Sequence, residues 1–421
     1  MAKTYDTYKD SGIAWIGNIP GEWKIKKLGN FYTQRNEKVS DKDFSPLSVT
    51  MQGILPQLET AAKTNDGDNR KLVRVGDFAI NSRSDRRGSC GISPYDGSVS
   101  LINTVLCPKD KMNAKFYNWL FHTTMFADEY YKWGHGIVDD LWTTRWSEMK
   151  NISVVEPPLS EQQAIDLYLD EKCGEIDSLI SLQEEMISEL QAYKQSVITE
   201  AVTKGLDPNV PMKDSSVEWI GQIPSNWGKD KIFRIFFIIG SGTTPKATDE
   251  RIFDGNINWI QSGDINGGIM IECKNKISEI VLSQYSTLKI YKAPFIIVAM
   301  YGASVGNISI SNIDGCVNQA CCVMSDSRQC FSYLFYAIKA AKDYLIYRAE
   351  GGGQPNISQD KIKNLWLPLP PLSEQQAIAS YLDEKTSQID SLIALKLEKI
   401  TELKDYKKSI IYEYVTGKKK V

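Results

Sequence analysis

An internal repeat limits what this chain can fold into more than any other feature of its sequence. Residues 157–165, Pro-Pro-Leu-Ser-Glu-Gln-Gln-Ala-Ile, return letter for letter as residues 370–378, 213 positions later. A second segment, residues 9–23, returns as residues 213–227 with a different offset of 204, keeping Lys-Asp-Ser, Trp-Ile-Gly, Ile-Pro and a final Trp. Self-similarity over such distances indicates one structural unit used twice.

The stretches between the repeated segments share little identity, so the repeat predicts a duplicated scaffold that carries two diverged domains. Both stretches combine short β-rich runs with aromatic-rich helical candidates, which predicts a mixed α/β fold class. At 421 residues the chain is too long for one hydrophobic core. The predicted parts are a first α/β domain over residues 1–156 with a lead-in segment at 8–23, a first spacer helix over 157–207, a second α/β domain over 208–369 with a lead-in segment at 212–227, and a second spacer helix over 370–421.

The letter-for-letter repeat predicts the start of a long helix. Pro157 and Pro158 block a helix upstream of them. Ser160 is a candidate N-cap, and Gln163 takes the position that a capping box gives to a glutamine. Because no proline follows before residue 203, we expect one long helix in each copy.

Apolar residues at a seven-residue spacing along both helices predict a coiled coil. Leu179, Met186 and Tyr193, with Ile180 and Ile187, widen this stripe in the first copy. We expect the two copies to pack on each other, with the polar residues Gln183 and Lys396 helping to fix their register. Two helices that each pack on their own domain are the alternative. The predicted seam, which also serves as a candidate partner-docking surface, consists of Leu169, Ile176, Gln183, Leu190, Val197, Leu382, Ile389, Lys396, Leu403 and Ile410.

A compact basic loop follows a predicted strand of the first domain. Residues 81–89 read Asn-Ser-Arg-Ser-Asp-Arg-Arg-Gly-Ser in a chain whose 49 basic and 52 acidic residues leave a net charge of −3. Arginine reads guanine edges and neutralises phosphates, so this composition favours a loop that enters a DNA groove. A solvated charged loop is the alternative. The candidate DNA-binding residues of this domain are Arg83, Ser84, Arg86, Arg87 and Arg145.

The second domain offers polar rather than charged candidates. Tyr301 and Ser304 lie in the stretch that corresponds to the basic loop, and Lys246 lies in an earlier glycine-rich turn. The side-chain amides of Gln354 and Asn356 have the donor and acceptor pair that recognises adenine. A structural glycine turn is the alternative for the loop that carries them.

Motifs for autonomous catalysis are missing from the sequence. It has no Asp/Asn-Pro-Pro-Tyr/Phe motif for adenine methylation and no complete phosphate-binding loop. Two histidines and eight cysteines without a CxxC pair predict no metal site and free or buried thiols. Asp264, Glu272 and Lys274 imitate a nuclease spacing, which we attribute to chance. We therefore predict no catalytic residue in this chain.

Nothing in the sequence predicts a membrane protein. The longest nearly apolar run, residues 293–303, is shorter than the ~18 residues that a membrane helix needs. The first residues lack the apolar core of a signal peptide, and we expect the chain to be cytoplasmic.

The repeated segments and the glycine-rich turn of the second domain resemble those of the specificity subunits of type I restriction–modification enzymes. Three features carry the resemblance: the repeated Pro-Leu-Ser-Glu-Gln-Gln-Ala-Ile, the Trp-Ile-Gly-x-Ile-Pro-x-x-Trp segment, and Gly-Ser-Gly-Thr-Thr-Pro at residues 240–245 followed by Trp-Ile-Gln-Ser-Gly-Asp-Ile at 259–265. The first domain departs from this pattern, because its residues 33–37 lack the glycine-threonine-proline turn.

The resemblance implies two target-recognition domains that each read half of a bipartite double-stranded DNA site, separated by two antiparallel helices. It also implies two modification subunits and two motor-nuclease restriction subunits as partners. S-adenosylmethionine, ATP and Mg would be bound by those partners, and no cofactor by this chain. A non-catalytic protein–protein scaffold without DNA contact is the alternative function.

Overall fold

The computed structural model describes residues 3–57, 67–83, 86–109, 112–136, 142–245, 252–349 and 355–421. By its packing the chain divides into two compact units, one formed by Met1–Glu184 with Leu397–Val421 and the other by Glu185–Lys396. Each unit contains mixed α/β structure, which confirms the predicted fold class. The predicted domain limits follow the repeat rather than the packing, and they stay a prediction.

The first unit is built on a four-stranded sheet of antiparallel pairs with a smaller three-stranded sheet beside it. Its strands are β1 (Tyr8–Asp10), β2 (Asn18–Pro20), β3 (Lys24–Lys27), β4 (Tyr32–Arg35), β5 (Lys38–Val39), β6 (Leu47–Thr50), β7 (Gly53–Pro56), β8 (Arg70–Val73), β9 (Phe78–Asn81), β10 (Cys90–Ile92), β11 (Gly97–Val99), β12 (Asn103–Pro108) and β13 (Ser153–Glu156). Its short helices are α1 (Ala114–Phe121), α2 (Thr124–Lys132) and α3 (Trp146–Met149). The sheet orders are β10-β9-β12-β4 and β11-β8-β5.

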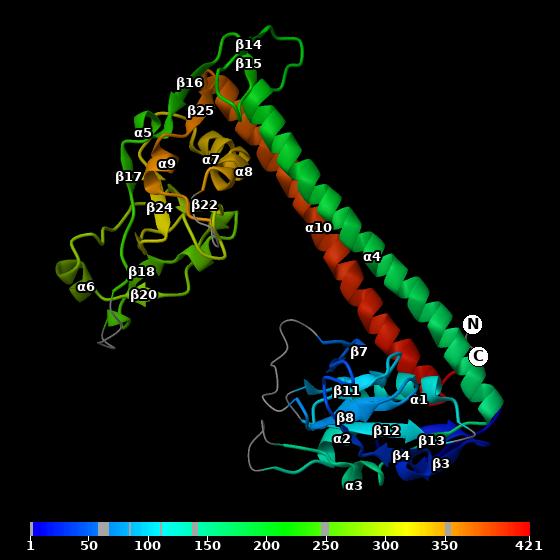
Figure 1. Cartoon of the computed structure of the whole chain (residues 1–421). Coiled ribbons are helices and arrows are strands. Elements are labelled where there is room, and N and C mark those ends of the chain that lie inside the picture. Colours follow the sequence, from blue (N-terminus) through cyan, green and yellow to red (C-terminus); the bar gives the residue numbers. More distant parts are fainter. Residues whose placement is uncertain are drawn as a thin grey trace. The chain divides into compact units, whose positions relative to one another are not determined.

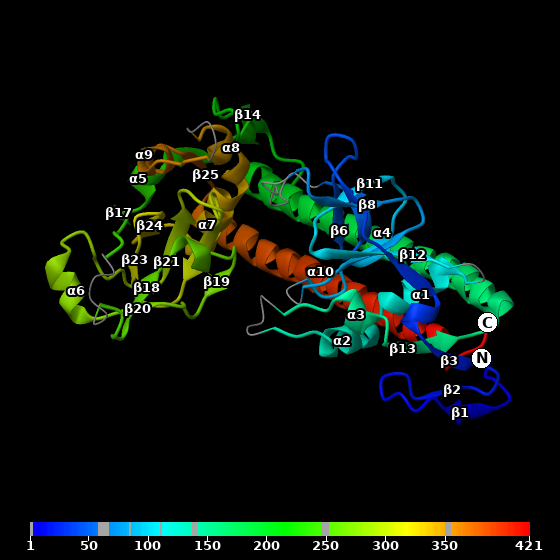
Figure 2. The ribbon, with the colours of Figure 1, turned by 60° about the horizontal axis from the view of Figure 1, so that its bottom comes forward.

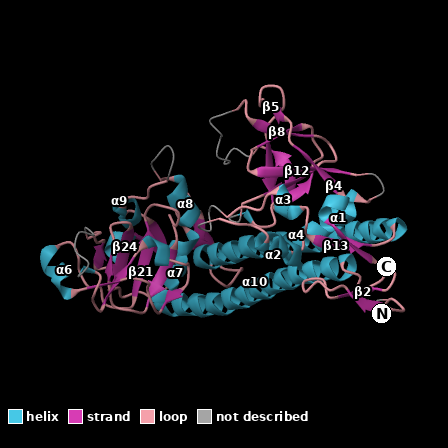
Figure 3. Ribbon diagram, turned by 90° about the horizontal axis from the view of Figure 1, so that it is seen from below, coloured by secondary structure: helices cyan, strands magenta, loops and turns pink. Residues whose placement is uncertain are grey.

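An aromatic core joins the larger sheet of the first unit to its helices. Figure 3 labels β4 and β12 of this sheet and the helix α1. The ring centre of Phe78 on β9 lies 4.9 Å from that of Phe121 on α1, and Phe121 lies 4.5 Å from Phe126 on α2. All three side chains are buried, so these ring contacts hold the start of β9 against α1 and α2.

The second unit repeats this plan with different residues. Its strands are β14 (Met212–Asp214), β15 (Gln222–Pro224), β16 (Gly228–Lys231), β17 (Ile238–Gly240), β18 (Ile257–Ile260), β19 (Ile269–Met270), β20 (Lys276–Ile277), β21 (Phe295–Ala299), β22 (Ile308–Ser311), β23 (Cys316–Val317), β24 (Cys321–Ser325) and β25 (Trp366–Leu369). Its short helices are α5 (Ile232–Ile235), α6 (Glu279–Gln284), α7 (Phe331–Ala340), α8 (Lys342–Tyr347) and α9 (Gln359–Lys363). In the larger sheet the order β17-β24-β21-β22 matches β4-β12-β9-β10, with β19 added at one edge, and α7 packs on β22. Figure 2 shows β24 and β21 of this sheet with α7 beside them.

Two long helices, α4 (Leu159–Lys204) and α10 (Leu372–Val415), confirm the predicted helices (Figure 1). The predicted N-cap is wrong by two residues, because α4 begins directly after Pro158 and Ser160 lies within its first turn. The backbone N–H groups of Glu161 and Gln162 both donate to the carbonyl of Pro158 at 2.9 Å. Pro158 has no N–H that would need a partner, so the helix can start immediately after it.

Within each unit, one half of α4 runs antiparallel to one half of α10. In the first unit Lys407 Nζ lies 2.6 Å from the carboxylate of Asp177. In the second unit Lys194 Nζ lies 2.6 Å from that of Asp390. The two ion pairs are the same pair used twice, because each partner recurs 213 positions along the chain. The pairing agrees with the predicted antiparallel coiled coil.

The helix pair buries a narrower stripe than the sequence predicts. Leu169 and Leu382 are fully buried, whereas Leu179 is 47% exposed and Tyr193 is 59% exposed. The prediction that these two residues widen the buried stripe is wrong, whereas Ile180, which was predicted to widen it as well, is buried. Two paired helices bury one side of each helix, and residues on the other side stay on the surface.

A buried glutamine joins each α/β domain to its long helix. In the first unit Gln162 Oε1 accepts from the backbone N–H of Asn113 at 2.9 Å, at the start of α1, while its Nε2 donates to the carbonyl of Pro157. In the second unit Gln375 Oε1 accepts from the N–H of Cys330 at 2.9 Å, at the start of α7. Both glutamines belong to the repeated motif, which therefore anchors the diverged domains in the same way.

The described parts of the chain provide no helix long and apolar enough to span a bilayer. Within the same residues no group of three or more His, Cys, Asp or Glu side chains could hold a metal ion. All eight cysteines are free thiols.

Candidate nucleic-acid interface

In the first unit, two segments that are distant in sequence meet where β9 ends. The backbone N–H of Thr144 donates to the carbonyl of Ser82 at 2.9 Å, and Arg83 forms an antiparallel bridge with Thr143. Arg145 follows directly and precedes α3. Two predicted DNA-binding residues, Arg83 and Arg145, are thus brought together. We term Ser82, Arg83, Thr143, Thr144 and Arg145 the first strand-end site.

The first strand-end site opens into a basic groove. Arg83 and Arg145 are exposed in it, and Lys71 and Lys150 add two further cations. Among the described residues that line the groove there is no carboxylate. Burial lowers the pKa of Lys71, whose Nζ donates to the carbonyl of Asn103 at 2.6 Å. The lining residues are Gln34, Lys71, Ser82, Arg83, Leu101, Ile102, Thr104, Thr143, Arg145, Trp146, Ser147 and Lys150.

The sequence did not identify Gln34, Lys71 or Lys150 as part of this groove. They come from β4, β8 and the residue after α3, and none belongs to the basic loop at residues 81–89. Lys71 carried one signal, because it is a polar residue on a strand whose other side chains are mostly buried. Only the pairing of the strands shows that these three side chains share a surface with Arg83.

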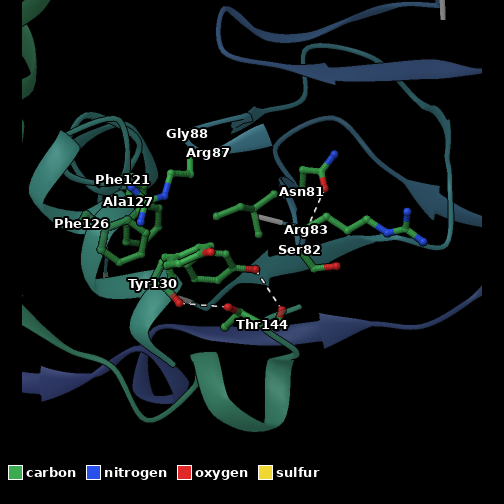
Figure 4. Close-up of a pocket in the computed structure, with 12 residues that line it drawn as sticks. Asn81, Ser82, Arg83, Arg87, Gly88, Phe121, Phe126, Ala127, Tyr130 and Thr144 are labelled. Atoms are coloured by element: carbon green, nitrogen blue, oxygen red, sulfur yellow. Dashed lines mark hydrogen bonds between the residues drawn. The ribbon is translucent and has the colours of Figure 1, made fainter. Parts of the chain in front are cut away.

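Arg87 points to a different place from Arg83 (Figure 4). Its guanidinium lies 4.1 Å from the ring centre of Tyr131 and 3.0 Å from the carboxylate of Asp128, both on α2. It lines a small aromatic pocket instead of the basic groove. Arg86 is exposed, and Ser84 lies outside the described residues.

Helix α2 also holds the other segment of the first strand-end site. The hydroxyl of Tyr130 donates to the carbonyl of Thr144 at 3.0 Å, and the hydroxyl of Thr144 donates to the carbonyl of Tyr130 at 2.9 Å (Figure 4). Both groups are buried, so these bonds are shielded from water. One helix therefore fixes both segments from which Arg83 and Arg145 project.

The second unit builds the same site at the end of β21. The backbone N–H of Ile357 donates to the carbonyl of Met300 at 2.8 Å, as that of Thr144 does to Ser82. Tyr301 follows Met300 in the sequence, and Asn356 precedes Ile357. Ser358 caps α9, accepting from the N–H of Lys361. We term Met300, Tyr301, Asn356, Ile357 and Ser358 the second strand-end site.

The second strand-end site is polar and carries no cation. Tyr301 is partly exposed and Asn356 is exposed. Burial raises the pKa of Tyr301, against a hydrogen bond with Gln319 that lowers it. Gln319, which the sequence did not single out, accepts from the hydroxyl of Thr244 at 2.5 Å. Ser304 is partly exposed near this site, whereas the predicted residues Lys246 and Gln354 lie outside the described residues.

The nuclease-like trio does not form a cluster of free acids. Asp264 Oδ2 accepts from the backbone N–H of Gln261 at 2.9 Å and closes a local turn. Glu272 and Lys274 are exposed. The chemistry that the two strand-end sites can perform is recognition, since guanidinium, ammonium, hydroxyl and amide groups suit phosphates and base edges.

A family model and two relatives match this chain to specificity proteins of type I restriction enzymes. Residues 224–405 match the family model of the type I restriction modification DNA specificity domain. The putative type I restriction enzyme MjaX specificity subunit of Methanocaldococcus jannaschii is 23% identical over 96% of each chain. The MjaVIII specificity subunit of the same organism is 24% identical over 96% of this chain and 94% of its own.

A solved structure shows the same fold. It comes from work on complex assembly and conformational transition of a type I R-M system, and it superposes with a TM-score of 0.71 at 16% sequence identity. The superposition covers 94% of this chain and 98% of the other.

Proposed function

We propose that this chain, which belongs to the specificity subunits of type I restriction–modification systems, reads the two halves of a bipartite double-stranded DNA site through its two strand-end sites. The observation that carries the proposal is the twin construction of these sites. Each is made by a backbone hydrogen bond between the segment after the central strand and the segment before a short helix. The scaffold is the same, and the residues that it presents differ.

The chemistry of the two sites suits different base edges. In the basic groove, the guanidinium groups of Arg83 and Arg145 suit guanine O6 and N7, and the ammonium groups of Lys71 and Lys150 suit phosphates. At the second site the amide of Asn356 suits adenine. Two different sets of groups are what an asymmetric bipartite sequence requires.

Repeated apolar side chains support docking of two identical partners. The first unit exposes Leu179 at 47% and Tyr406 at 56%. The second unit exposes their repeat counterparts, Leu392 at 48% and Tyr193 at 59%. Exposed apolar side chains on paired helices favour a protein partner, and the same set used twice favours two copies of it. We propose one modification subunit on each set.

We assign the chemistry of the complex to its partners. Two modification subunits would bind S-adenosylmethionine and methylate adenine, and two restriction subunits would use ATP and Mg to translocate and cleave DNA. This chain would bind none of these cofactors and would supply only sequence choice and docking.

Reconstitution tests the proposal. The purified chain together with its modification subunit should methylate adenine at one bipartite motif, which sequencing of methylated bases in a treated genome would identify. The chain alone should neither methylate nor cleave DNA. Methylation by the chain alone, or a motif without two separate halves, would contradict the proposal. Assembly with the modification subunit without any DNA binding would instead support a protein scaffold.

A further inference from the structure

A groove in the second unit is lined by aromatic rings and cations that neither strand-end site uses. Trp219, Trp366 and Tyr344 contribute rings, and Lys231, Arg348 and Lys361 contribute positive charge. We term it the stem groove. Asp360 is the one carboxylate among the described residues that line it, so the lining is cationic.

Two cations of the stem groove, Lys231 and Arg348, donate to neutral side-chain groups. Lys231 Nζ donates to Asn364 Oδ1 at 3.0 Å and lies 5.5 Å from the ring centre of Trp366. The guanidinium of Arg348 donates to the hydroxyl of Tyr344 at 2.8 Å. Because Asn364 and Tyr344 carry no charge, they orient Lys231 and Arg348 without forming ion pairs with them. The groove is preorganised for an anion.

The groove lies at the base of the loop that carries Gln354 and Asn356. In the sequence this loop follows Arg348, at the end of α8, and precedes Ser358, which caps α9. Lys361 Nζ donates to the backbone carbonyl of Arg348 at 2.5 Å and so closes the base of the loop. An anion in the groove would therefore lie next to the second strand-end site.

The first unit has no counterpart of this groove in its described residues. Trp15, the repeat counterpart of Trp219, is 8% exposed and is covered by Phe126, whose ring centre lies 6.1 Å away. Ser153 stands where the second unit has Trp366. The duplicated docking surfaces proposed above serve identical partners, whereas a groove present once suits a ligand that is itself asymmetric. A DNA duplex with two different half-sites is such a ligand.

We propose that the stem groove binds the sugar–phosphate backbone of the DNA beside the half-site that the second domain reads, an inference that rests on the proposed function. The phosphates would lie on Lys231 and Arg348, and the apolar faces of the deoxyriboses would pack on the tryptophan rings. Such contacts position the duplex and carry no base information.

Substitution of the groove cations in the complex with modification subunits tests this role. Lys231→Ala and Arg348→Ala should each weaken DNA binding severalfold. The loss should be equal for a duplex that contains the recognition motif and for a duplex that lacks it. Each lost phosphate contact should make the slope of log K against log salt shallower by about one. The methylated motif should stay unchanged.

Two variants serve as controls. Lys27→Ala removes the matching charge from β3, where the first unit has no groove, and should leave both binding and salt slope unchanged. Lys231→Arg keeps the charge and should restore most of the affinity lost in Lys231→Ala.

Three outcomes would overturn the proposal while leaving the proposed function intact. The first is unchanged affinity and salt slope in both alanine variants. The second is a loss confined to the motif duplex, which would make the groove a reader of bases. The third is loss of assembly with the modification subunit at unchanged DNA affinity, which would make it a protein-docking surface. A wild-type complex without a sequence preference would instead refute the proposed function itself.

Discussion

The two α/β domains share a skeleton and differ in where they place positive charge. In the first, four cations line the basic groove, and two of them belong to the strand-end site itself. In the second, the strand-end site carries Tyr301 and Asn356, and the cations lie in the stem groove at the base of the neighbouring loop. The features that stay the same are backbone hydrogen bonds and the glutamine anchor. Recognition can therefore change by side-chain replacement while the scaffold persists.

The largest expected effect concerns the shared anchor. Gln162→Leu leaves the backbone N–H of Asn113 without its partner, and the free energy of unfolding should fall by about 1–3 kcal/mol. Gln375→Leu should cost the second domain a similar amount, because Cys330 loses the same bond. Urea denaturation followed by tryptophan fluorescence measures both.

Gln163→Leu is the matched control for this comparison, because Gln163 is an exposed neighbour on the same helix. It should change stability little. If Gln162→Leu proved no more destabilising than Gln163→Leu, the two domains would not be anchored by this glutamine.

A smaller effect distinguishes two possible roles of Arg87 in the first domain, which are to position the loop that carries Arg83 or to contact DNA itself. Asp128→Asn removes the ionic partner that holds Arg87 against α2, so the loop that carries Arg83 should loosen and DNA affinity should fall severalfold. If Arg87 contacted DNA itself, its release would raise affinity, so the sign of the change decides between the roles. Glu129→Gln removes an equal charge from the same helix while its amide can still accept from Trp133, and it should have little effect in a fluorescence-anisotropy titration.

The smallest expected effect is a dependence of stability on acidic pH that Asp166 gives to the first unit. Burial raises the pKa of Asp166, whereas its repeat counterpart is Ala379. The folded chain holds this proton more tightly than the unfolded chain, so stability should decline as pH rises from ~3.9 through the raised pKa. Asp166→Asn keeps a partner for Asn113 and should abolish that decline. The difference in Tm between variant and wild type should therefore grow from pH 4 upward and then level off; a constant difference would contradict the assignment.

The long helices could be predicted because the proline pair, the heptad spacing and the duplication are all visible in the order of residues along the chain. It missed the start of α4 because the carbonyl of Pro158 takes the role expected of Ser160. Composition identified Arg83, but nothing local predicted that it would share a groove with Lys71 and Lys150. Those side chains meet through strand pairing between distant residues, which spacing in the sequence does not encode.

The exposure of Tyr193 could not be predicted for a related reason. A heptad pattern gives the face of a helix, but the width of the face that is buried depends on how many helices pack together. Two helices leave Tyr193 and Leu179 on the surface. The same sequence pattern is therefore compatible with a wider bundle or with a partner-docking surface.

The most direct test of the central claim is the set of methylated bases in DNA treated with the complex carrying altered strand-end sites. Arg83→Ala with Arg145→Ala should relax or change only one half of the bipartite motif, at a cost of about 1–3 kcal/mol for each arginine that reads a base. Tyr301→Ala with Asn356→Ala should affect only the other half. Changes in both halves from either pair of substitutions, or an unchanged motif from both, would contradict the claim that each strand-end site reads its own half-site.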